Sequence, residues 1–303
     1  MRYIKLYHSG ELFKKIREIE SYLYPCTLCP NRCGVDRAFG KVGICRSAVS
    51  PRVASYNLHF GEEPPLVGEG GSGTIFFSGC SLHCVFCQNY PISHYNVGND
   101  VSIGRLAEMM LELQNRGAVN INLVTPTHYV HAVLRALPIA IEMGLSIPIV
   151  FNCSGYERVE VLKILEGVID IYLPDAKYGD NGVGKRYSGV SDYWEVNRRA
   201  LKEMFRQKGD KLVVNSDGVA VEGMIIRHLV LPSNVSNSIK VLRFIAEELS
   251  VNIPISLMSQ YFPAFRSSKY KEINRKLFLQ EYEEVKEAAI SMGFRDLWIQ
   301  EIG

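Results

Sequence analysis

The amino-acid sequence predicts an α/β protein with a mostly parallel sheet and a small cysteine-rich module at its amino terminus. After Gly73, short β-branched runs alternate with helical stretches along the rest of the chain. Seven of the eight cysteines fall into two tight groups within residues 26–87, while Cys153 stands apart. Strands that alternate with helices pair in parallel through right-handed crossovers. Cysteines grouped in this way indicate metal or cluster ligation rather than disulfides.

The individual elements follow from the pattern of apolar residues and turn residues. Runs rich in Val, Ile and aromatic residues predict strands, and longer amphipathic stretches bounded by turn residues predict helices. In chain order, the predicted strands are 74–78, 120–124, 148–152, 169–173, 223–231 and 253–258, with a terminal strand at 297–301. The predicted helices are 103–116, 129–143, 157–165, 192–207, 236–249 and 273–292. Six such units are too few to close an eight-stranded barrel.

Composition and charge exclude several classes of protein. The 303 residues are 47% hydrophobic and 22% charged, which is enough to bury a sizeable core. A net charge of +2 gives no reason to expect a nucleic-acid or anionic-membrane partner. No apolar run approaches the roughly 20 residues that span a bilayer, and MRYIKLYHSG lacks the apolar centre of a signal peptide. The sequence therefore predicts a cytoplasmic protein without a membrane partner.

The most informative motif is GCSLHCVFCQN, in which Cys80, Cys84 and Cys87 have CxxxCxxC spacing directly after the strand 74–78. A structural zinc site or an electron-transfer cluster normally takes four protein ligands. Three clustered thiolates ligate three irons of a [4Fe–4S] cube and leave the fourth iron open. The spacing therefore predicts a cluster that binds an exogenous ligand.

A second group of cysteines has the spacing CxxCxxxC, followed by a fourth cysteine twelve positions further on; its members are Cys26, Cys29, Cys33 and Cys45. Four thiolates are enough for a structural zinc, a rubredoxin-like iron or an auxiliary [4Fe–4S] cluster. Zinc needs tetrahedral geometry, whereas a cluster needs sulfurs spread around a cube, and spacing does not decide between them. The sequence leaves these three centres and a metal-free segment open.

At the triplet the chain resembles the radical S-adenosylmethionine (SAM) superfamily, and especially the PflX branch among the relatives of pyruvate formate-lyase activating enzyme. Similar blocks occur over most of residues 26–262, at 73–78, 120–128 (NINLVTPTH), 148–157 (PIVFNCSGYE), 168–178 (VIDIYLPDAKY), 225–232 (IIRHLVLP) and 258–261 (MSQY). The resemblance implies a partial (β/α)6 TIM-like barrel of the radical SAM type, with ligands at the carboxyl ends of the strands. It also implies that SAM binds the open iron and is cleaved reductively to a 5′-deoxyadenosyl radical.

The resemblance assigns SAM contacts to particular residues. Asp175 and Lys177 match the D-x-K element of glycyl-radical activases, and strand alternation points both side chains to one side. Phe86 takes the position of an aromatic residue near the adenine. Arg227 matches an arginine of strand five that pairs with the SAM carboxylate, and His228 should then face the other way.

At two positions the chain departs from the activase pattern. The GGE-type motif that contacts the SAM amino group after strand two is absent, and Thr125 and Thr127 are the expected substitutes. Gln260 stands in the stretch where activases tend to have a histidine. Two further SAM contacts are expected where strand three ends, at Asn152 and Ser154.

These features predict a radical SAM enzyme, without identifying its catalytic residues. The resemblance implies hydrogen abstraction from a glycine of a partner glycyl-radical enzyme, while the four-cysteine module favours a small molecule or another protein substrate. A flavodoxin or a ferredoxin is the expected reductant. The alternative is a non-catalytic iron–sulfur electron carrier or scaffold, which would need no open iron and no Asp175, Lys177 or Arg227.

Two domains are expected, a four-cysteine module with its linker at 1–70 and the radical SAM barrel with its C-terminal helix at 71–303. The Gly-, Pro- and Glu-rich stretch 61–70 is interpreted as a linker or a loop over the next domain. For His59, Glu62 and Glu63, a solvated or capping role is favoured over a substrate or acid–base role at the barrel mouth. The segment 177–188 is interpreted as a lid.

Overall fold

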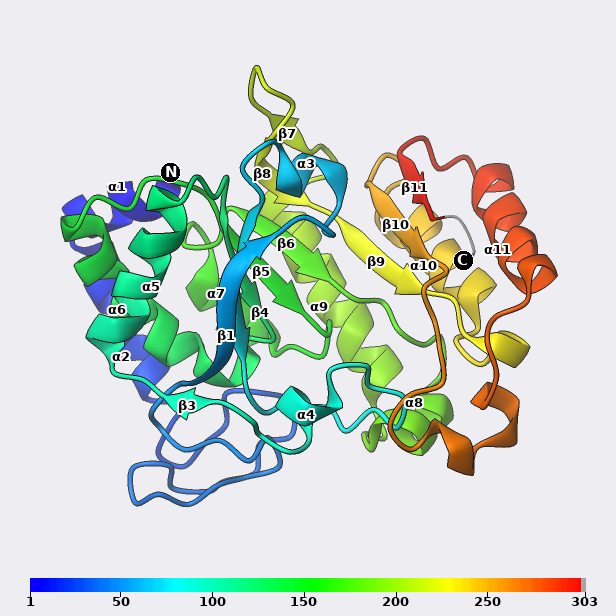
Figure 1. Ribbon diagram of the computed structural model, residues 1–303, viewed down its shortest axis with the longest axis horizontal. Helices are drawn as coiled ribbons and strands as arrows, with labels where there is room; N and C mark the ends of the chain where they lie inside the picture. Colours follow the sequence, from blue (N-terminus) through cyan, green and yellow to red (C-terminus); the bar gives the residue numbers. More distant parts are fainter. Residues whose placement is uncertain (301–303) are drawn as a thin grey trace.

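A mostly parallel sheet lies at the centre of the computed structural model, which describes residues 1–300 (Figure 1). An eight-stranded sheet has the order β3-β1-β2-β4-β5-β6-β8-β7, and a three-stranded sheet has the order β11-β10-β9. The parallel strands are β2 (Ser72–Phe77), β4 (Ile121–Val124), β5 (Ile149–Cys153), β6 (Ile171–Pro174), β8 (Ala220–Met224), β9 (Ile226–Leu229), β10 (Ile255–Met258) and β11 (Leu297–Ile299). The antiparallel strands are β1 (Arg52–His59), β3 (Asn99–Asp100) and β7 (Val213–Val214). The α/β fold with a mostly parallel sheet is therefore confirmed.

The strand predicted at 223–231 begins earlier, at Ala220, and is divided at Ile225 into β8 and β9. β8 pairs with β6, whereas β9 pairs with β10, so the chain changes neighbours at this point. Asp175 and Arg227 form an isolated bridge between the two sheets, and the Ala176 amide donates to the Arg227 carbonyl at 2.8 Å. The two sheets thus continue one another, and six predicted strands follow in parallel from β2 to β10.

Helices cover the outer face of the sheet, which we define by Phe151, Tyr172 and Ile226 (Figure 1). These side chains share one buried core with Leu106 of α5 and Leu201 of α9. Six of the helices after β2 are α5 (Ile103–Asn115), α6 (Val130–Glu142), α7 (Val159–Leu165), α9 (Tyr193–Lys208), α10 (Ser238–Glu248) and α11 (Leu279–Ser291). They lie where the sequence predicts helices.

The opposite, inner face of the sheet is covered in part by a helix that the sequence does not predict. Leu66 of α3 (Pro64–Val67) is fully buried in one cluster with Val150 and Ile171, and the Asn120 amide donates to its carbonyl at 2.8 Å. Figure 1 shows α3 beside β7 and β8, at the opposite end of the strands from α4 (Tyr90–Ser93). The stretch 61–70 therefore packs against the inner face.

Three elements before residue 60 are not predicted by the sequence. β1 pairs antiparallel with β2 along its length, and α1 (Arg2–His8) and α2 (Glu11–Glu20) pack against α6. In β1, one residue of eight is buried, so the strand has no apolar run to reveal it. The domain boundary at residue 70 stays a prediction.

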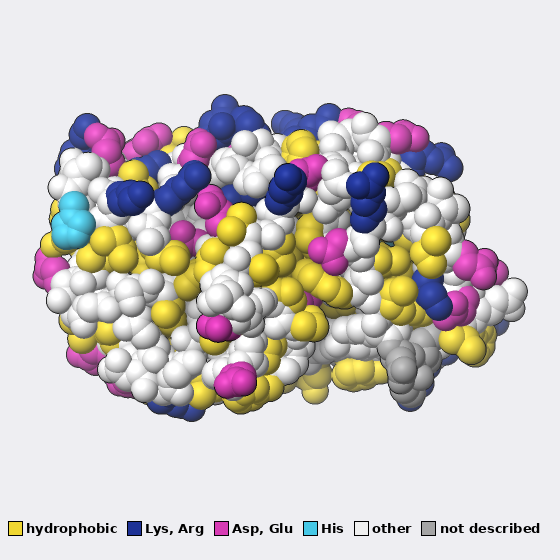
Figure 2. Space-filling model, turned by 90° about the horizontal axis from the view of Figure 1, so that it is seen from above, with side chains coloured by type: hydrophobic (Ala, Val, Ile, Leu, Met, Phe, Trp, Pro, Cys, Tyr) yellow, Lys and Arg dark blue, Asp and Glu magenta, His cyan; other side chains and the backbone are white. Residues whose placement is uncertain are grey.

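The carboxyl-terminal elements differ from the prediction at their ends. α11 begins at Leu279 instead of residue 273, because the Glu281 carboxylate accepts the Phe278 amide at 3.0 Å and so fixes the first turn. β11 ends at Ile299, and Glu301 of the predicted terminal strand lies outside the described residues. Across residues 1–300, no helix is both long and apolar enough to cross a membrane. Figure 2 shows Lys, Arg and acidic side chains intermixed above a band of hydrophobic side chains.

Candidate active site at the carboxyl ends of the strands

The loop that carries the cysteine triplet leaves β2 at Phe77 and turns at Gly79. Gly79 has a φ of +84°, and a Cβ there would clash with the carbonyl oxygen of Cys45 and lie 2.7 Å from the hydroxyl of Ser47. Glycine meets both requirements, since it adopts this φ without strain and has no Cβ. The turn places Cys80 directly after the carboxyl end of β2.

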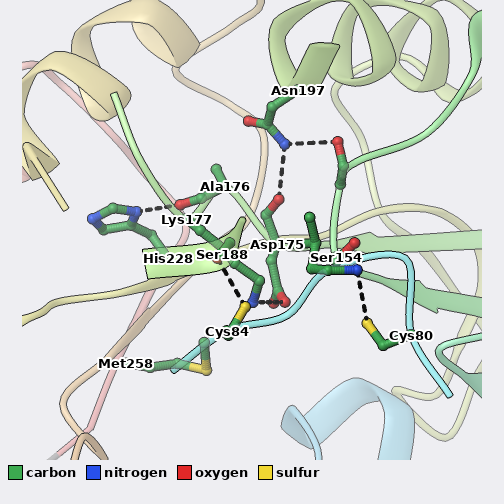
Figure 3. A network of polar contacts seen from close by, with 12 residues as sticks. Cys80, Cys84, Ser154, Asp175, Ala176, Lys177, Ser188, Asn197, His228 and Met258 are labelled. Carbon is green, nitrogen blue, oxygen red and sulfur yellow. Dashed lines mark hydrogen bonds and ion pairs between the residues drawn. The ribbon is translucent and has the colours of Figure 1, made fainter. Parts of the chain in front are cut away.

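Two serine hydroxyls lie against sulfurs of the triplet. Cys84 Sγ is 2.9 Å from Ser188 Oγ (Figure 3). Cys87 Sγ is 3.1 Å from Ser93 Oγ. When the sulfurs are thiolates, the hydroxyls are the donors of these hydrogen bonds. The sequence gives no sign of Ser188, because 104 positions separate it from Cys84.

The backbone also fixes the triplet loop to the segment that was predicted as a lid. The amide of His83 donates to Ser188 O at 3.0 Å, and the amide of Val85 donates to Tyr187 O at 2.8 Å. This segment contains the helix α8 (Asn181–Ser188). The end of α8 and the cysteine loop therefore form one hydrogen-bonded unit.

The donor set of the triplet suits an iron–sulfur cluster. Burial raises the pKa of Cys80 and Cys84, and the ammonium of Lys177 acts in the opposite direction at both thiols. Buried thiolates need cationic partners, which irons supply. Among residues 1–300, no three His, Cys, Asp or Glu side chains are arranged to hold a metal ion. A cube places its cysteines on different irons, so its ligands lie farther apart than those of a single ion.

Asp175 and Lys177 follow β6 and point to the same side, as strand alternation predicts (Figure 3). Lys177 Nζ donates to Asp175 Oδ2 at 2.5 Å, and the two side chains are 21% and 23% exposed. Burial opposes the charge of Lys177, but Asp175 and the Cys84 thiol together raise the pKa of the ammonium. The pair therefore places a fixed positive charge beside the cysteine triplet.

Helix α9 holds the ends of β5 and β6 in place. The Asn197 amide donates to Gly155 O and to Asp175 O, each at 3.0 Å (Figure 3). The Tyr193 hydroxyl donates to Ser154 O at 2.9 Å. These contacts fix the backbone from which the expected SAM contacts project.

Arg227 and His228 of β9 point to opposite faces. His228 lies on the outer side, where it contacts Ala176 O at 2.6 Å and Ser238 Oγ at 2.8 Å, and burial lowers its pKa to about 4. Arg227 lies on the inner side and donates through Nε and Nη2 to the two carboxylate oxygens of Glu63, each at 2.6 Å. Arg227 Nη2 also bonds Glu62. The predicted SAM ligand Arg227 is thus already held by two carboxylates.

The residues after β4 and β5 that are expected to contact SAM differ in whether their polar groups already have hydrogen-bond partners. The Thr125 amide donates to Asn152 O at 2.8 Å, and Thr125 has a φ of +58°. The Thr127 hydroxyl is buried and donates to Glu157 at 2.7 Å, so it is not free for SAM. Asn152 is 9% exposed, and the Ser154 hydroxyl is buried without a partner in the described part of the chain. Ser154 therefore has an unused hydrogen-bonding group near Asp175.

Phe86 and Gln260 are the remaining two residues that are expected to contact SAM. Phe86 is 6% exposed and meets the rings of Tyr178 and Tyr261 edge-on, with centroids 6.4 and 5.9 Å apart. Gln260 Nε2 lies 3.4 Å from Met258 Sδ. Phe86 is thus part of an aromatic cluster beside the triplet loop.

Comparison with known proteins identifies the domain that contains this site. The family model described as the radical SAM superfamily matches residues 74–224. MJ0674, an uncharacterized protein of Methanocaldococcus jannaschii, is 33% identical over 284 residues, which cover 91% of this chain and 77% of that protein. The chain belongs to the radical SAM superfamily. The triplet and the Asp175–Lys177 pair lie within the matched residues, whereas Arg227 lies outside them.

Other proteins are more distantly similar to this radical SAM chain. MJ0808, also an uncharacterized protein of Methanocaldococcus jannaschii, is 22% identical over 264 residues, covering 80% of this chain and 71% of that protein. Streptococcus suis SuiB has a TM-score of 0.45 and 15% identity over 75% of this chain. SuiB bound to its precursor peptide SuiA has a TM-score of 0.47 and 15% identity over 73% of this chain. The chain spans less than half of the SuiB chains, 47% and 46%.

The four-cysteine group precedes the matched radical SAM residues and forms a compact turn. The Cys26 amide donates to Val35 O at 2.9 Å, and the Gly34 amide donates to Cys26 O at 3.0 Å. Burial, together with the neighbouring thiols Cys45 and Cys26, raises the pKa of Cys29 to about 12. The cysteines of this group are therefore close enough to interact electrostatically.

This segment lies directly against the triplet loop. Besides the approach of Cys45 to Gly79, Asn31 Nδ2 donates to Ser81 O at 2.7 Å and His83 Nε2 lies 2.9 Å from Ile44 O. The two cysteine groups, separate in the sequence, are thus neighbours in the fold. Sequence spacing predicts each group but not their contact.

Proposed function

We propose that this protein is a radical SAM enzyme that holds a [4Fe–4S] cluster on Cys80, Cys84 and Cys87 and cleaves SAM reductively. The observation that carries the proposal is the position of the Asp175–Lys177 pair beside the triplet loop, at the carboxyl ends of parallel strands. Ligands bind at this end of parallel sheets. The succession of β2 to β10 supports the partial (β/α)6 barrel that this chemistry uses.

When bound, the reduced cluster supplies the electron that cleaves SAM to methionine and a 5′-deoxyadenosyl radical, which takes hydrogen from the substrate. The protein residues bind and orient. Lys177 takes the carboxylate of SAM, and Asp175 takes its ribose hydroxyls. Phe86 supports the adenine, and Ser188 and Ser93 donate to cluster sulfurs.

The remaining contacts complete the SAM site. Arg227 faces the same carboxylate through Nη1, since Nε and Nη2 bond Glu63 and Glu62. Ser154 and Asn152 take the amino group, together with the backbone of Thr125. Gln260 stays a proposed contact, whereas the bond from Thr127 to Glu157 favours a role for Thr127 in support of the site.

A second metal centre on Cys26, Cys29, Cys33 and Cys45 belongs to the proposal, as zinc, iron or an auxiliary cluster, and of these the cluster agrees better with the side chains of residues 1–300, no three of which are placed to hold a single ion. The burial of Cys26, Cys29 and Cys45 supports it, because buried thiols grouped in one turn are suited to metal binding. The substrate is a glycine of a glycyl-radical enzyme, another protein or a small molecule, and a flavodoxin or ferredoxin supplies the electron.

The test is anaerobic reconstitution with iron and sulfide, addition of dithionite and SAM, and measurement of 5′-deoxyadenosine by mass spectrometry. We expect product from the wild type and from Cys153→Ala, the matched control outside both cysteine groups. Cys84→Ala should give a yield at least about a hundredfold lower, because it removes one of the three proposed cluster ligands, and even loss of a residue that supports a metal ligand commonly costs up to about a hundredfold. A wild type with a full, reducible cluster that neither cleaves SAM nor shows a SAM-dependent change in its paramagnetic resonance would instead be an electron carrier.

A further inference from the structure

Arg37 lies between the third and fourth cysteines of the four-cysteine segment (residues 26–45), and it is buried to within 1% of its surface. Its guanidinium donates to backbone carbonyls, through Nε to Ala48 O at 3.2 Å and through Nη1 to His128 O at 2.7 Å. Nη2 also bonds Ala48 O. The guanidinium carbon lies 5.5 Å from the centroid of the Tyr129 ring. All these partners are uncharged.

The ionisable side chains that face Arg37 from the next elements are neutral as well. The Nε2 atoms of His128 and His131 lie 2.8 and 2.9 Å from backbone carbonyls, so each imidazole is a donor at Nε2. Burial lowers the pKa of both histidines to about 3, and the charge of Arg37 acts in the same direction. Burial also raises the pKa of Tyr129. At neutral pH none of these groups supplies a negative charge.

The positive charge of Arg37 therefore has no carboxylate to balance it. Among residues 1–300, no acidic side chain forms an ion pair with Arg37, and the adjacent Asp36 accepts the amide of Ala38 at 3.0 Å instead. A buried charge without a partner is costly. Other buried ionisable groups escape this cost by becoming neutral, but a guanidinium keeps its proton in proteins. The position of Arg37 thus calls for an anion.

The thiols of the four-cysteine segment converge next to this charge. A Cβ at Gly43 would clash with Cys33 Sγ, so glycine lets Cys33 approach the chain that leads to Cys45. The thiol of Cys26 is in turn close enough to Cys33 and Cys45 to be affected by their charges. Burial raises the pKa of Cys26, and the guanidinium of Arg37 opposes this rise. The charge of Arg37 therefore reaches the group of thiols.

A metal centre on these thiols would be the missing anion. Cysteine thiols without metal are neutral below their ordinary pKa of about 8.5, so they do not balance a cation at neutral pH. Metal ligands are thiolates. Four thiolates outweigh the positive charge of a zinc ion, of a single iron or of a [4Fe–4S] core, so each of these centres has a net negative charge when bound. Binding of any of them would give Arg37 its counter-charge.

We propose that Arg37 is the buried counter-ion of an anionic metal centre on the four-cysteine segment, and that its charge sets how tightly this centre is held. The inference rests on the proposed function, because the second metal centre is part of that proposal. It assigns a role to a residue that is not a metal ligand. It also means that the metal-free segment contains an uncompensated charge, so the segment is suited to the loaded state.

The test uses the full chain with Cys80→Ala, Cys84→Ala and Cys87→Ala, so that bound metal belongs to the four-cysteine segment. This parent is stripped with a chelator and loaded with Zn²⁺ or with iron and sulfide. Arg37→Gln keeps an amide donor for the carbonyls but removes the charge. The chelator concentration that removes half of the metal should fall about tenfold or more, because opposite charges about 10 Å apart are worth this factor at an effective dielectric constant of about 20.

Unfolding of the stripped and the loaded protein separates the charge of Arg37 from its hydrogen bonds. Stripped Arg37→Gln should be at least as stable as the stripped parent, since it removes an uncompensated charge, whereas loaded Arg37→Gln should be less stable than the loaded parent. Arg37→Lys keeps the charge and should retain most of the affinity for metal. Lys41→Gln removes an exposed charge of the same segment and should bind metal like the parent.

A redox measurement adds a readout that loss of packing does not move. After loading with iron and sulfide, Arg37→Gln should lower the reduction potential by about 60 mV or more, which is a tenfold change for a one-electron couple. Equal retention of metal in Arg37→Gln and the parent, or the same loss of stability in the stripped and loaded forms, would overturn the inference alone. A parent that binds neither Zn²⁺ nor iron with sulfide would defeat the second metal centre of the proposed function itself.

Discussion

The two cysteine groups lie side by side but have different surroundings. Two sulfurs of the triplet have hydroxyl partners: Ser188, from a distant part of the chain, lies on Cys84, and Ser93 lies on Cys87, six positions away. In the four-cysteine segment, the thiols of Cys26 and Cys29 are contacted instead by the backbone amides of Leu28 and Asn31. Polar side chains around a metal ligand tune the metal centre. The proposed function therefore assigns the reactive centre to the triplet and a structural centre to the four-cysteine segment.

The largest expected effect comes from removing a cysteine of the four-cysteine segment. Cys29→Ala should remove the metal of the first group and lower the free energy of unfolding by at least about 3 kcal/mol, because metal binding there is coupled to folding. Iron at the triplet should remain. Metal analysis and denaturant unfolding of Cys29→Ala and the control Cys153→Ala check this. Unchanged metal content and stability would show that the first group holds no metal.

A smaller effect is expected at Glu157, which lies near Cys29 of the four-cysteine segment. It accepts a hydrogen bond from Thr127, and its charge raises the pKa of Cys29. Burial raises the pKa of Glu157 to about 8, from an ordinary value of 4.5. The protonated carboxyl therefore contributes stability that is full below about pH 4.5 and is lost as pH rises to about 8, a few kcal/mol in all.

Glu157→Gln should remove this fall in stability between pH 5 and pH 8. Urea unfolding at several pH values measures it, with Glu160→Gln as the control, since the side chain of Glu160 is 51% exposed. If wild type and Glu157→Gln show the same pH dependence, Glu157 is ionised in the folded protein and its carboxylate is more hydrated than its burial indicates.

The smallest effect should come from Ser188→Ala at the reactive centre. Loss of the hydroxyl that donates to Cys84 should lower the reduction potential of the cluster and slow SAM cleavage a few-fold, as for loss of about 1 kcal/mol. A redox titration followed by paramagnetic resonance measures it, with the exposed Ser146→Ala as control. A reduction potential equal to that of the wild type would show that the Ser188 hydroxyl does not tune the cluster, and the proposed difference between the two cysteine groups would then be lost.

Local sequence patterns predict much of the fold. The alternation of apolar runs locates the parallel strands between β2 and β10 within a few residues, and it places Asp175 with Lys177 and Arg227 opposite His228. These features depend on neighbours in the chain, so a window of sequence contains them. β1 is missed because most of its residues are only partly buried and half of them are polar, and the two-residue strands β3 and β7 are too short to show a pattern.

The contacts that define the site are longer in range. Glu63 meets Arg227 across 164 positions and Ser188 meets Cys84 across 104, and neither has a local signature. The sequence weighs Glu62 and Glu63 as barrel-mouth groups or as solvated or capping residues, whereas the structure buries both side chains against Arg227, with Glu63 at the N-cap position of α3 but without a side-chain cap bond. Such pairs become visible only when the chain is folded, because burial and charge balance are properties of the assembled sheet.

The packing of α3 on the inner face has a kinetic consequence. Leu66 packs against Val150 and Ile171, so an apolar layer covers the inner face at the end of the strands opposite α4 (Figure 1). Under the proposed function, a substrate that lies deeper in the barrel than SAM must bind before SAM, and its product must leave last. The steady-state kinetics should therefore be ordered, with the product of the substrate inhibiting competitively against the substrate and 5′-deoxyadenosine inhibiting noncompetitively against SAM.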